Sequence, residues 1–125
     1  MLEDLETAIT EDFPSLEQTS WEIKYVDEAL EDFLSPAFYL TPPVDTNSPN
    51  SIHINNSSEM SSLELYTTLA HEGYPGHLYQ NVYFASKEEE PIRYLLDYPG
   101  YSEGWATYVE SWSYSTVDVG KEKKA

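Results

Sequence analysis

The dipeptide Pro75-Gly76 constrains the fold of this chain most, because it interrupts a well-marked helical pattern. Ser61-Ser62-Leu63-Glu64 matches a capping box, in which a serine hydroxyl and a glutamate carboxylate satisfy free N–H groups at a helix start. Leu65 and Leu69 then supply a buried face. A proline cannot donate the next helical hydrogen bond, and its ring clashes with the preceding turn. The sequence therefore predicts a helix that starts near residue 61, breaks before Pro75 and resumes at about Leu78.

Two histidines, His71 and His77, flank this break at a spacing of six residues. In a regular helix, six residues turn by about 600° and rise by about 9 Å, which leaves the imidazoles about 120° apart and unable to share a metal ion. A bulged turn over residues 73–76 would return His77 to the face of His71. We therefore predict that the helix breaks between Glu72 and His77, and a shared metal site requires that break.

A second acidic segment, Ser102-Glu103-Gly104-Trp105-Ala106, supplies a candidate third ligand and begins another predicted helix. Catalytic zinc commonly takes three protein ligands and a water, and two histidines with one carboxylate form a frequent set. The chain has no cysteine, so thiolate ligands are excluded. We predict that His71, His77 and Glu103 bind one Zn²⁺ ion, and that Glu72 is the general base toward the bound water.

These four residues also have structural interpretations, since a histidine and a glutamate on one helix are common without a metal. The histidines could be surface or core groups, and Glu72 could be a solvated carboxylate. Glu103 could be a carboxylate stabilised by the dipole at a helix N-terminus. The Pro-Gly break and Glu103 together favour the metal site.

Four further residues near the two motifs are candidates for supporting roles. Tyr74 and Tyr101 could donate a hydrogen bond to a tetrahedral intermediate, or could belong to the core or the wall of a cleft. Asp97 could orient a ligand imidazole, because metal-bound histidine usually donates its second N–H to a carboxylate or carbonyl. Glu110 could replace Glu103 as a ligand or lie behind a ligand.

A helix and several strands are predicted upstream of the motifs. Residues 2–13 carry apolar side chains at helical spacing, and residues 21–26 alternate apolar and polar like a strand. Ala37–Leu40 and residues 51–55 flank a turn-rich stretch, so we predict that they pair as antiparallel strands. Prolines near the ends of these strands suit a sheet edge, and His53 is assigned a packing or edge role rather than a ligand role.

Composition and charge exclude several classes of protein. A chain of 125 residues with 40% hydrophobic residues is one domain's worth and too apolar for a disordered acidic chain. The net charge of −17 repels phosphate backbones and anionic lipids, so nucleic acid and membrane partners are not expected. No apolar run approaches the roughly 20 residues of a membrane-spanning helix.

We expect one α+β domain over residues 1–125, mainly helical with a small antiparallel sheet. An N-terminal helix and strand region covers residues 1–34, and an extended edge-strand region covers residues 35–60. The metal-motif helices follow at 61–118, and a frayed tail follows at 119–125.

The two motifs resemble the paired signatures of a known bacterial family. Residues 71–80, HEGYPGHLYQ, and 101–110, YSEGWATYVE, are similar to those of the family called domain of unknown function 885 (DUF885), which is grouped with zincin-like metallopeptidases. The Glu-Gly-Trp-Ala segment is also similar to the Asn-Glu-Gly-Phe-Ala segment that carries the glutamate ligand in gluzincin aminopeptidases. The resemblance implies that His71 and His77 bind the metal, that Glu72 is catalytic and that Glu103 is the third ligand.

Members of that family are several times longer, so the chain resembles an excised segment that holds the metal motifs. In zincins an edge strand commonly binds the extended backbone of the substrate. The resemblance therefore implies a substrate-binding edge strand made of Ser51, Ile52, His53, Ile54 and Asn55. The compartment is open: the bacterial cytoplasm, or the cell envelope or exterior if a signal was removed with the missing part.

The expected function is zinc-dependent hydrolysis of peptide or related amide bonds by a zincin-like fold, with a peptide substrate as the partner. One alternative is a non-catalytic binding module, whose acidic surface recognises a partner and whose His-Glu cluster is a vestigial or structural metal site. Another is a folding unit that has no activity by itself. The sequence leaves the substrate sequence and the oligomeric state open.

Overall fold

The computed structural model describes the chain except for residues 18, 44–47, 88–89, 97 and 118–125. The elements follow one another as α1 (Leu2–Asp12), β1 (Trp21–Tyr25), the 3-10 helix η1 (Glu28–Phe33), β2 (Ala37–Leu40), β3 (Asn50–Ile54), α2 (Ser62–Glu72), α3 (His77–Ala85), α4 (Ile92–Leu95) and α5 (Pro99–Ser113). The α+β class, with helices as the larger part, is confirmed. The predicted tail at 119–125 lies outside the described residues, as does Asp97.

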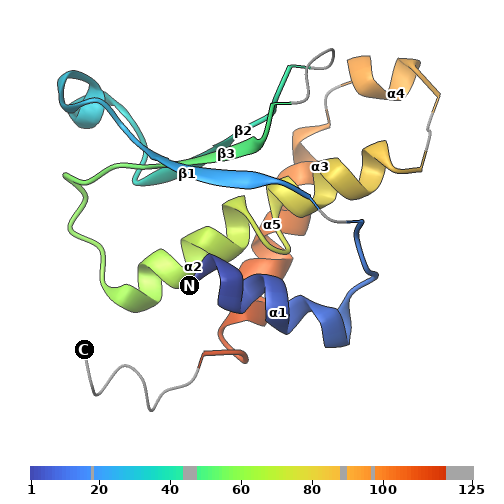
Figure 1. Ribbon diagram of the computed structural model, residues 1–125, viewed down its shortest axis with the longest axis horizontal. Helices are drawn as coiled ribbons and strands as arrows, with labels where there is room; N and C mark the ends of the chain where they lie inside the picture. Colours follow the sequence, from blue (N-terminus) through green and yellow to red (C-terminus); the bar gives the residue numbers. More distant parts are fainter. Residues whose placement is uncertain (18, 44–47, 88–89, 97, 118–125) are drawn as a thin grey trace.

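One face of the sheet is covered by helices (Figure 1). In that view α1, α2 and most of α5 lie below the three strands, and α3 extends to the right of β1. Buried side chains of α1, β3, α2, the α2–α3 connection and α3 form the shared core: Leu2, Leu5, Ile9, Ile52, Leu69, Ala70, Tyr74, Leu78 and Tyr79. The helical spacing of the apolar residues in α1 therefore produces the packing face that the sequence predicts. Among the described helices, none is both long and apolar enough to cross a membrane.

The sheet is mixed, with the strand order β1-β3-β2. β2 and β3 are antiparallel, as predicted, with Tyr39 opposite Ile52. β1 pairs with the other side of β3 in parallel, with Ile23 opposite Ile52. The prediction of a purely antiparallel sheet is therefore wrong, because the local strand patterns give no information on the pairing of β1 with a strand that follows much later in the chain.

The same topology corrects the predicted substrate-binding edge strand. The segment Ser51, Ile52, His53, Ile54 and Asn55 covers most of the central strand β3 and the residue after it, so its backbone is paired on both sides. The side chain of Asn55 donates to the carbonyls of Glu31 and Leu34, which fixes the loop around η1. β3 is therefore not an edge strand, and the edges of this sheet are β1 and β2.

The helix breaks where the sequence predicts. The capping box at the start of α2 is present, with the Ser61 side chain accepting from the Glu64 N–H and the Glu64 carboxylate accepting from the Ser61 N–H. α2 ends at Glu72 and α3 begins at His77. Gly76 is pressed against the end of α2, because a Cβ built there would lie 1.7 Å from the His71 carbonyl oxygen. Only glycine fits this close approach.

α5 packs alongside α2 and contacts α3. Ala106 and Val109 are fully buried on its inner face. The indole Nε1 of Trp105 donates to the Pro75 carbonyl oxygen at 2.7 Å, so α5 is tied directly to the helix break. Pro99 lies in the first turn of α5, a position that tolerates proline because its missing N–H would have no helical partner.

Candidate metal centre

The break between α2 and α3 brings His71 and His77 together. His71 lies in the last turn of α2, and His77 is the first residue of α3. Their rings lie edge to face with centroids 5.0 Å apart. An unbroken helix would separate the two residues by about 9 Å along its axis, so the break is what allows both rings to reach one point.

Glu103, in the second turn of α5, completes a group that could hold a metal ion. Its Oε2 lies 3.4 Å from Nε2 of His71, and its Oε1 lies 3.4 Å from Nε2 of His77. One ligand atom from each residue lies within 4.8 Å of the other two. Ligand atoms at about 2.0–2.2 Å from a tetrahedral ion lie about 3.3–3.6 Å apart, so both histidine-glutamate separations fit such an ion.

The three side chains differ in exposure. His71 and His77 are 21% and 18% exposed, whereas Glu103 is 61% exposed. Protein therefore covers most of the two histidine side chains, whereas the Glu103 side chain is open to solvent. An open position beside three protein ligands is what distinguishes catalytic zinc sites from closed structural ones.

Glu110 lies behind His71 rather than within the group. Its Oε2 is 3.0 Å from Nδ1 of His71, the nitrogen that does not face Glu103. Glu103 and Glu110 are seven residues apart on α5, so they lie two helical turns apart on one face. A carboxylate that accepts from Nδ1–H fixes the ring orientation and leaves the Nε2 lone pair for a metal.

Glu72 faces the sheet instead of α5. It follows His71 by one residue, about 100° around α2, and its Oε2 accepts a hydrogen bond from the Tyr39 N–H at 2.9 Å. The Asn55 N–H donates to the Pro36 carbonyl, so these two residues form a hydrogen-bonded pair between the strands. Hydrogen-bonded and non-hydrogen-bonded pairs alternate along antiparallel strands, so the N–H of Tyr39, which is opposite Ile52, points away from β3. The carboxylate of Glu72 therefore bridges the metal-bearing helix and the open edge of β2.

Tyr74 lies in the core, which was one of the two positions that the sequence left open for it. Its side chain is only 2% exposed and belongs to the core, and it borders a small cavity with Glu6 and Phe13 below α1. Burial, with a smaller contribution from the charge of Glu6, raises the pKa of Tyr74 to about 12. The chain leaves the helix after Glu72, so Tyr74 turns inward while the histidines face outward.

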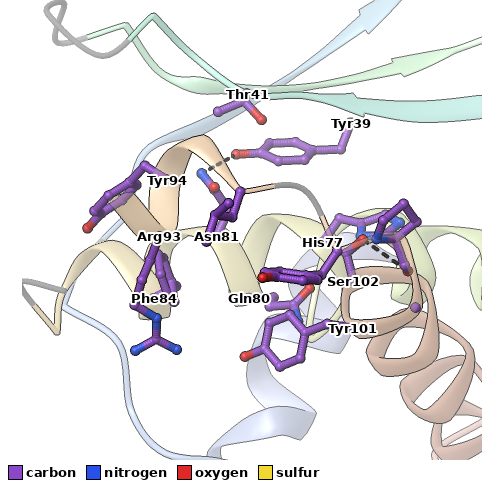
Figure 2. Close-up of a pocket in the computed structure, with 14 residues that line it drawn as sticks. Tyr39, Thr41, His77, Gln80, Asn81, Phe84, Arg93, Tyr94, Tyr101 and Ser102 are labelled. Atoms are coloured by element: carbon purple, nitrogen blue, oxygen red, sulfur yellow. Dashed lines mark hydrogen bonds between the residues drawn. The ribbon is translucent and has the colours of Figure 1, made fainter. Parts of the chain in front are cut away.

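Tyr101 and His53 lie in different parts of the structure. Tyr101, which is 64% exposed, lies in the first turn of α5 near His77 (Figure 2). Asp97 lies outside the described residues. His53 stacks on Phe38 with ring centroids 5.1 Å apart, on the face of the sheet opposite Ile52, so it has the packing role that the sequence favours.

A cavity of about 990 Å³ adjoins the histidine cluster, and His77 lines it. Its walls come from β2 and the residue after it, from α3 and α4 and from the start of α5: Tyr39, Thr41, His77, Gln80, Asn81, Phe84, Arg93, Tyr94, Leu96, Tyr98, Pro99, Gly100, Tyr101 and Ser102. Sequence reasoning missed most of these residues. Gln80, Asn81 and Phe84 follow His77 by three, four and seven residues, so helical spacing alone could have placed them on its face.

Comparisons with known proteins fit this description. No curated protein matches the chain. A solved structure entitled "The crystal structure of the putative lipoprotein from Colwellia psychrerythraea" is similar, with 25% sequence identity and a TM-score of 0.82. The similarity covers 97% of this chain and 21% of that protein, so the chain spans about a fifth of its relative's length.

A protein-family model identifies the family of this chain. The model described as "Bacterial protein of unknown function (DUF885)" matches residues 1–115, which is most of the chain and includes His71, His77 and Glu103. The resemblance noted in the two sequence motifs is thus matched by a similarity that also covers α1, the sheet and the whole of α5. The chain belongs to the DUF885 family of bacterial proteins.

Proposed function

We propose that this chain carries the metal centre of a zinc-dependent hydrolase of peptide or related amide bonds. The observation that carries the proposal is the convergence of two histidine Nε2 atoms on the two oxygens of Glu103, each at 3.4 Å. Two histidines and a carboxylate on an open site match a common catalytic zinc set. A zinc ion bound there would lower the pKa of its water toward neutrality and polarise the scissile carbonyl.

The protein groups then have separate roles. His71, His77 and Glu103 hold the ion, and Glu110 holds His71 through Nδ1. Glu72 accepts the proton of the attacking water at its carboxylate and returns it to the leaving amine. The hydrogen bond from the Tyr39 N–H fixes one oxygen of Glu72.

A structural site is the competing function, and one observation favours it. His71 contacts carboxylates through both ring nitrogens, so the cluster already links α2 to α5 at two points and could serve only to hold the helices together. In that case the bound ion would be fully coordinated by protein groups and would activate no water.

Zinc binding by variants tests the ligand assignment. Elemental analysis after dialysis against zinc should give one ion per chain, and the double variant His71→Ala/His77→Ala should bind none. His53→Ala is the matched control, because His53 lies on the other face of the sheet, and it should keep the ion. Retention of stoichiometric zinc by the double variant would overturn the site.

Glu72→Gln separates the catalytic from the structural function. The variant should keep zinc and lose hydrolysis of a quenched-fluorescence peptide library by a factor of about 10²–10⁴, the usual contribution of a general base. Hydrolysis is measured on this chain and on a full-length DUF885 protein that carries the same residues. Unchanged hydrolysis in Glu72→Gln would remove Glu72 from the mechanism, and absence of hydrolysis in both zinc-loaded proteins would favour the structural site.

A further inference from the structure

The cavity beside the metal centre differs in character from the rest of this acidic chain. Its rings come from Tyr39, Phe84, Tyr94, Tyr98 and Tyr101, and they surround a volume of about 990 Å³. That volume is at the upper end of the range of about 300–1,000 Å³ that small-molecule sites occupy. It therefore has room for a large side chain together with the backbone next to it.

The lining is also depleted in negative charge. The whole chain has 23 acidic residues, yet none of the lining residues in the described part of the chain is acidic. A lysine or arginine side chain would lose its hydration in this cavity without gaining a carboxylate partner among the described lining residues. Aromatic walls instead favour ring-to-ring contacts, in offset or edge-to-face geometry.

One wall of the cavity holds an unused polar group. Nε2 of Gln80 is buried and has no hydrogen-bond partner among the described residues. Its neighbour Asn81 is different, because its amide donates to the Tyr39 hydroxyl at 3.2 Å (Figure 2). That hydroxyl in turn donates to Asn50 at 2.7 Å. A buried amide without a partner costs stability, unless a bound molecule supplies an acceptor.

The position of Gln80 relates this amide to the metal centre. Gln80 lies three residues after His77 on α3, which places the two side chains on one face of the helix. His77 faces both Glu103 and the cavity. A peptide whose scissile carbonyl lay at the metal centre would thus have a neighbouring side chain at the cavity entrance.

We propose that this cavity receives an aromatic side chain from a residue that flanks the scissile bond, and that the Gln80 amide donates to an oxygen of that residue. This inference rests on the proposed function, because it places the scissile bond at the metal centre. The oxygen is either the phenolic hydroxyl of a tyrosine or the backbone carbonyl of the aromatic residue. Comparison of tyrosine with phenylalanine substrates distinguishes these two acceptors.

Hydrolysis of a matched peptide panel tests the inference. The panel places Tyr, Phe, Ala or Lys on either side of one scissile bond, and kcat/KM is measured on the zinc-loaded chain. We expect the aromatic peptides to exceed the alanine peptide by about tenfold or more at one of the two positions, as expected for a filled apolar pocket, with lysine the poorest. Equal values for all four residues at both positions would overturn the inference.

Two variants identify the cavity as the source of the preference. Gln80→Leu should lower kcat/KM of the aromatic peptides about five- to tenfold. If the phenolic oxygen is the acceptor, only the tyrosine peptide should show this loss. Phe84→Ala should lower kcat/KM of the aromatic peptides and so lower the preference for aromatic over alanine peptides. Tyr114→Ala is the matched control, since Tyr114 is 56% exposed and does not line the cavity. An unaltered preference in both cavity variants would overturn the assignment.

A binding measurement separates this inference from the proposed function. Calorimetry of N-acetyl-tyrosinamide and N-acetyl-alaninamide with the same chain requires no catalysis. Tighter binding of the tyrosine amide, reduced by Gln80→Leu in a variant with an unchanged circular dichroism spectrum, supports the aromatic cavity even if no peptide is hydrolysed. Absence of hydrolysis then counts against the enzyme alone, and equal binding of the two amides counts against the cavity.

Discussion

The tripeptide Tyr-Pro-Gly occurs twice in this chain, at 74–76 and at 98–100, with opposite structural results. The first copy is buried, and its glycine lies against the end of α2 so closely that a Cβ would meet the His71 carbonyl oxygen at 1.7 Å. The second copy is exposed at the start of α5, and a Cβ on Gly100 would meet nothing within 4 Å. The same three residues therefore join two helices beside the candidate metal centre in one place and merely start a helix in the other.

The largest expected effect comes from the two glycines. Gly76→Ala should destabilise the protein by more than about 3 kcal/mol, because its methyl group would overlap the backbone at the end of α2. Gly100→Ala should instead stabilise by about 0.5–1 kcal/mol, since alanine is the better residue within a helix. Urea unfolding measures both changes. Equal unfolding midpoints for the two variants would contradict the contrast between the copies.

A smaller effect is expected at Glu110, where α5 contacts His71, three residues before the first copy. Glu110→Ala removes the carboxylate that holds Nδ1 of His71 at 3.0 Å. Zinc affinity should fall about 10- to 100-fold, as is usual when the partner of a ligand histidine is lost. Competition with a chelator measures the affinity, and Glu28→Ala, on exposed η1, is the control. Unchanged affinity would show that Glu110 does not orient the ligand.

Two tryptophans of α5 donate hydrogen bonds to different partners: Trp105 bonds to the first copy, and Trp112 bonds to the end of α1. Trp105→Phe leaves the buried Pro75 carbonyl without its partner and should cost about 1–2 kcal/mol. Trp112→Phe removes an exposed bond to Asp12 and should cost about 0.5 kcal/mol. Thermal unfolding compares the two. A larger loss at Trp112 would mean that the bond to Pro75 is not what fastens α5 to the break.

The smallest effect is expected at the tyrosines of the two copies. In the described part of the chain the buried Tyr74 hydroxyl makes no hydrogen bond, so Tyr74→Phe should change stability at pH 7 by less than about 1 kcal/mol. Tyr98 is 64% exposed, and Tyr98→Phe should change the stability still less. Neither variant should alter zinc binding. Urea unfolding measures the change in stability, and zinc titration measures the binding.

The pH dependence distinguishes the two tyrosines more sharply. The folded pKa of Tyr74 is raised to about 12, above the ordinary value of 10.0, so folding favours its neutral form. This contribution is fully present below pH 10 and is lost as the pH rises from 10 to 12. Tyr74→Phe should therefore flatten the decline of stability in that range. An identical decline in the wild type and the variant would sink this assignment.

Local signals in the sequence predicted the parts of the site that depend on local chemistry. Pro75 forces the helix to end, the capping box fixes its start, and the spacing of His71 and His77 makes sense only with a break between them. Glu103 was recognised from its motif, and its position on the same helix face as Glu110 follows from their spacing. These features rest on residues that are close in the sequence.

Contacts between distant segments could not be predicted in the same way. Strand alternation in residues 21–25 indicates a strand but not its parallel pairing with β3, so the central strand was mistaken for an edge. The inward turn of Tyr74 depends on how the break packs against α1. The cavity needs β2, α3, α4 and α5 in place at once, and Glu72 meets Tyr39 only after the sheet has docked on α2.

The hydrogen bond between Glu72 and the Tyr39 N–H also bears on self-association. An open strand edge with free N–H groups is a template on which another chain can add a strand, and proteins commonly protect such edges with charge. The Glu72 oxygen occupies the outward N–H of β2 as a hydrogen-bond acceptor and so protects that edge against pairing with a second molecule. Replacement by glutamine keeps an oxygen acceptor there, whereas alanine would uncover the edge and favour aggregation. Glutamine is therefore the substitution that isolates the chemistry of Glu72 from its protective role.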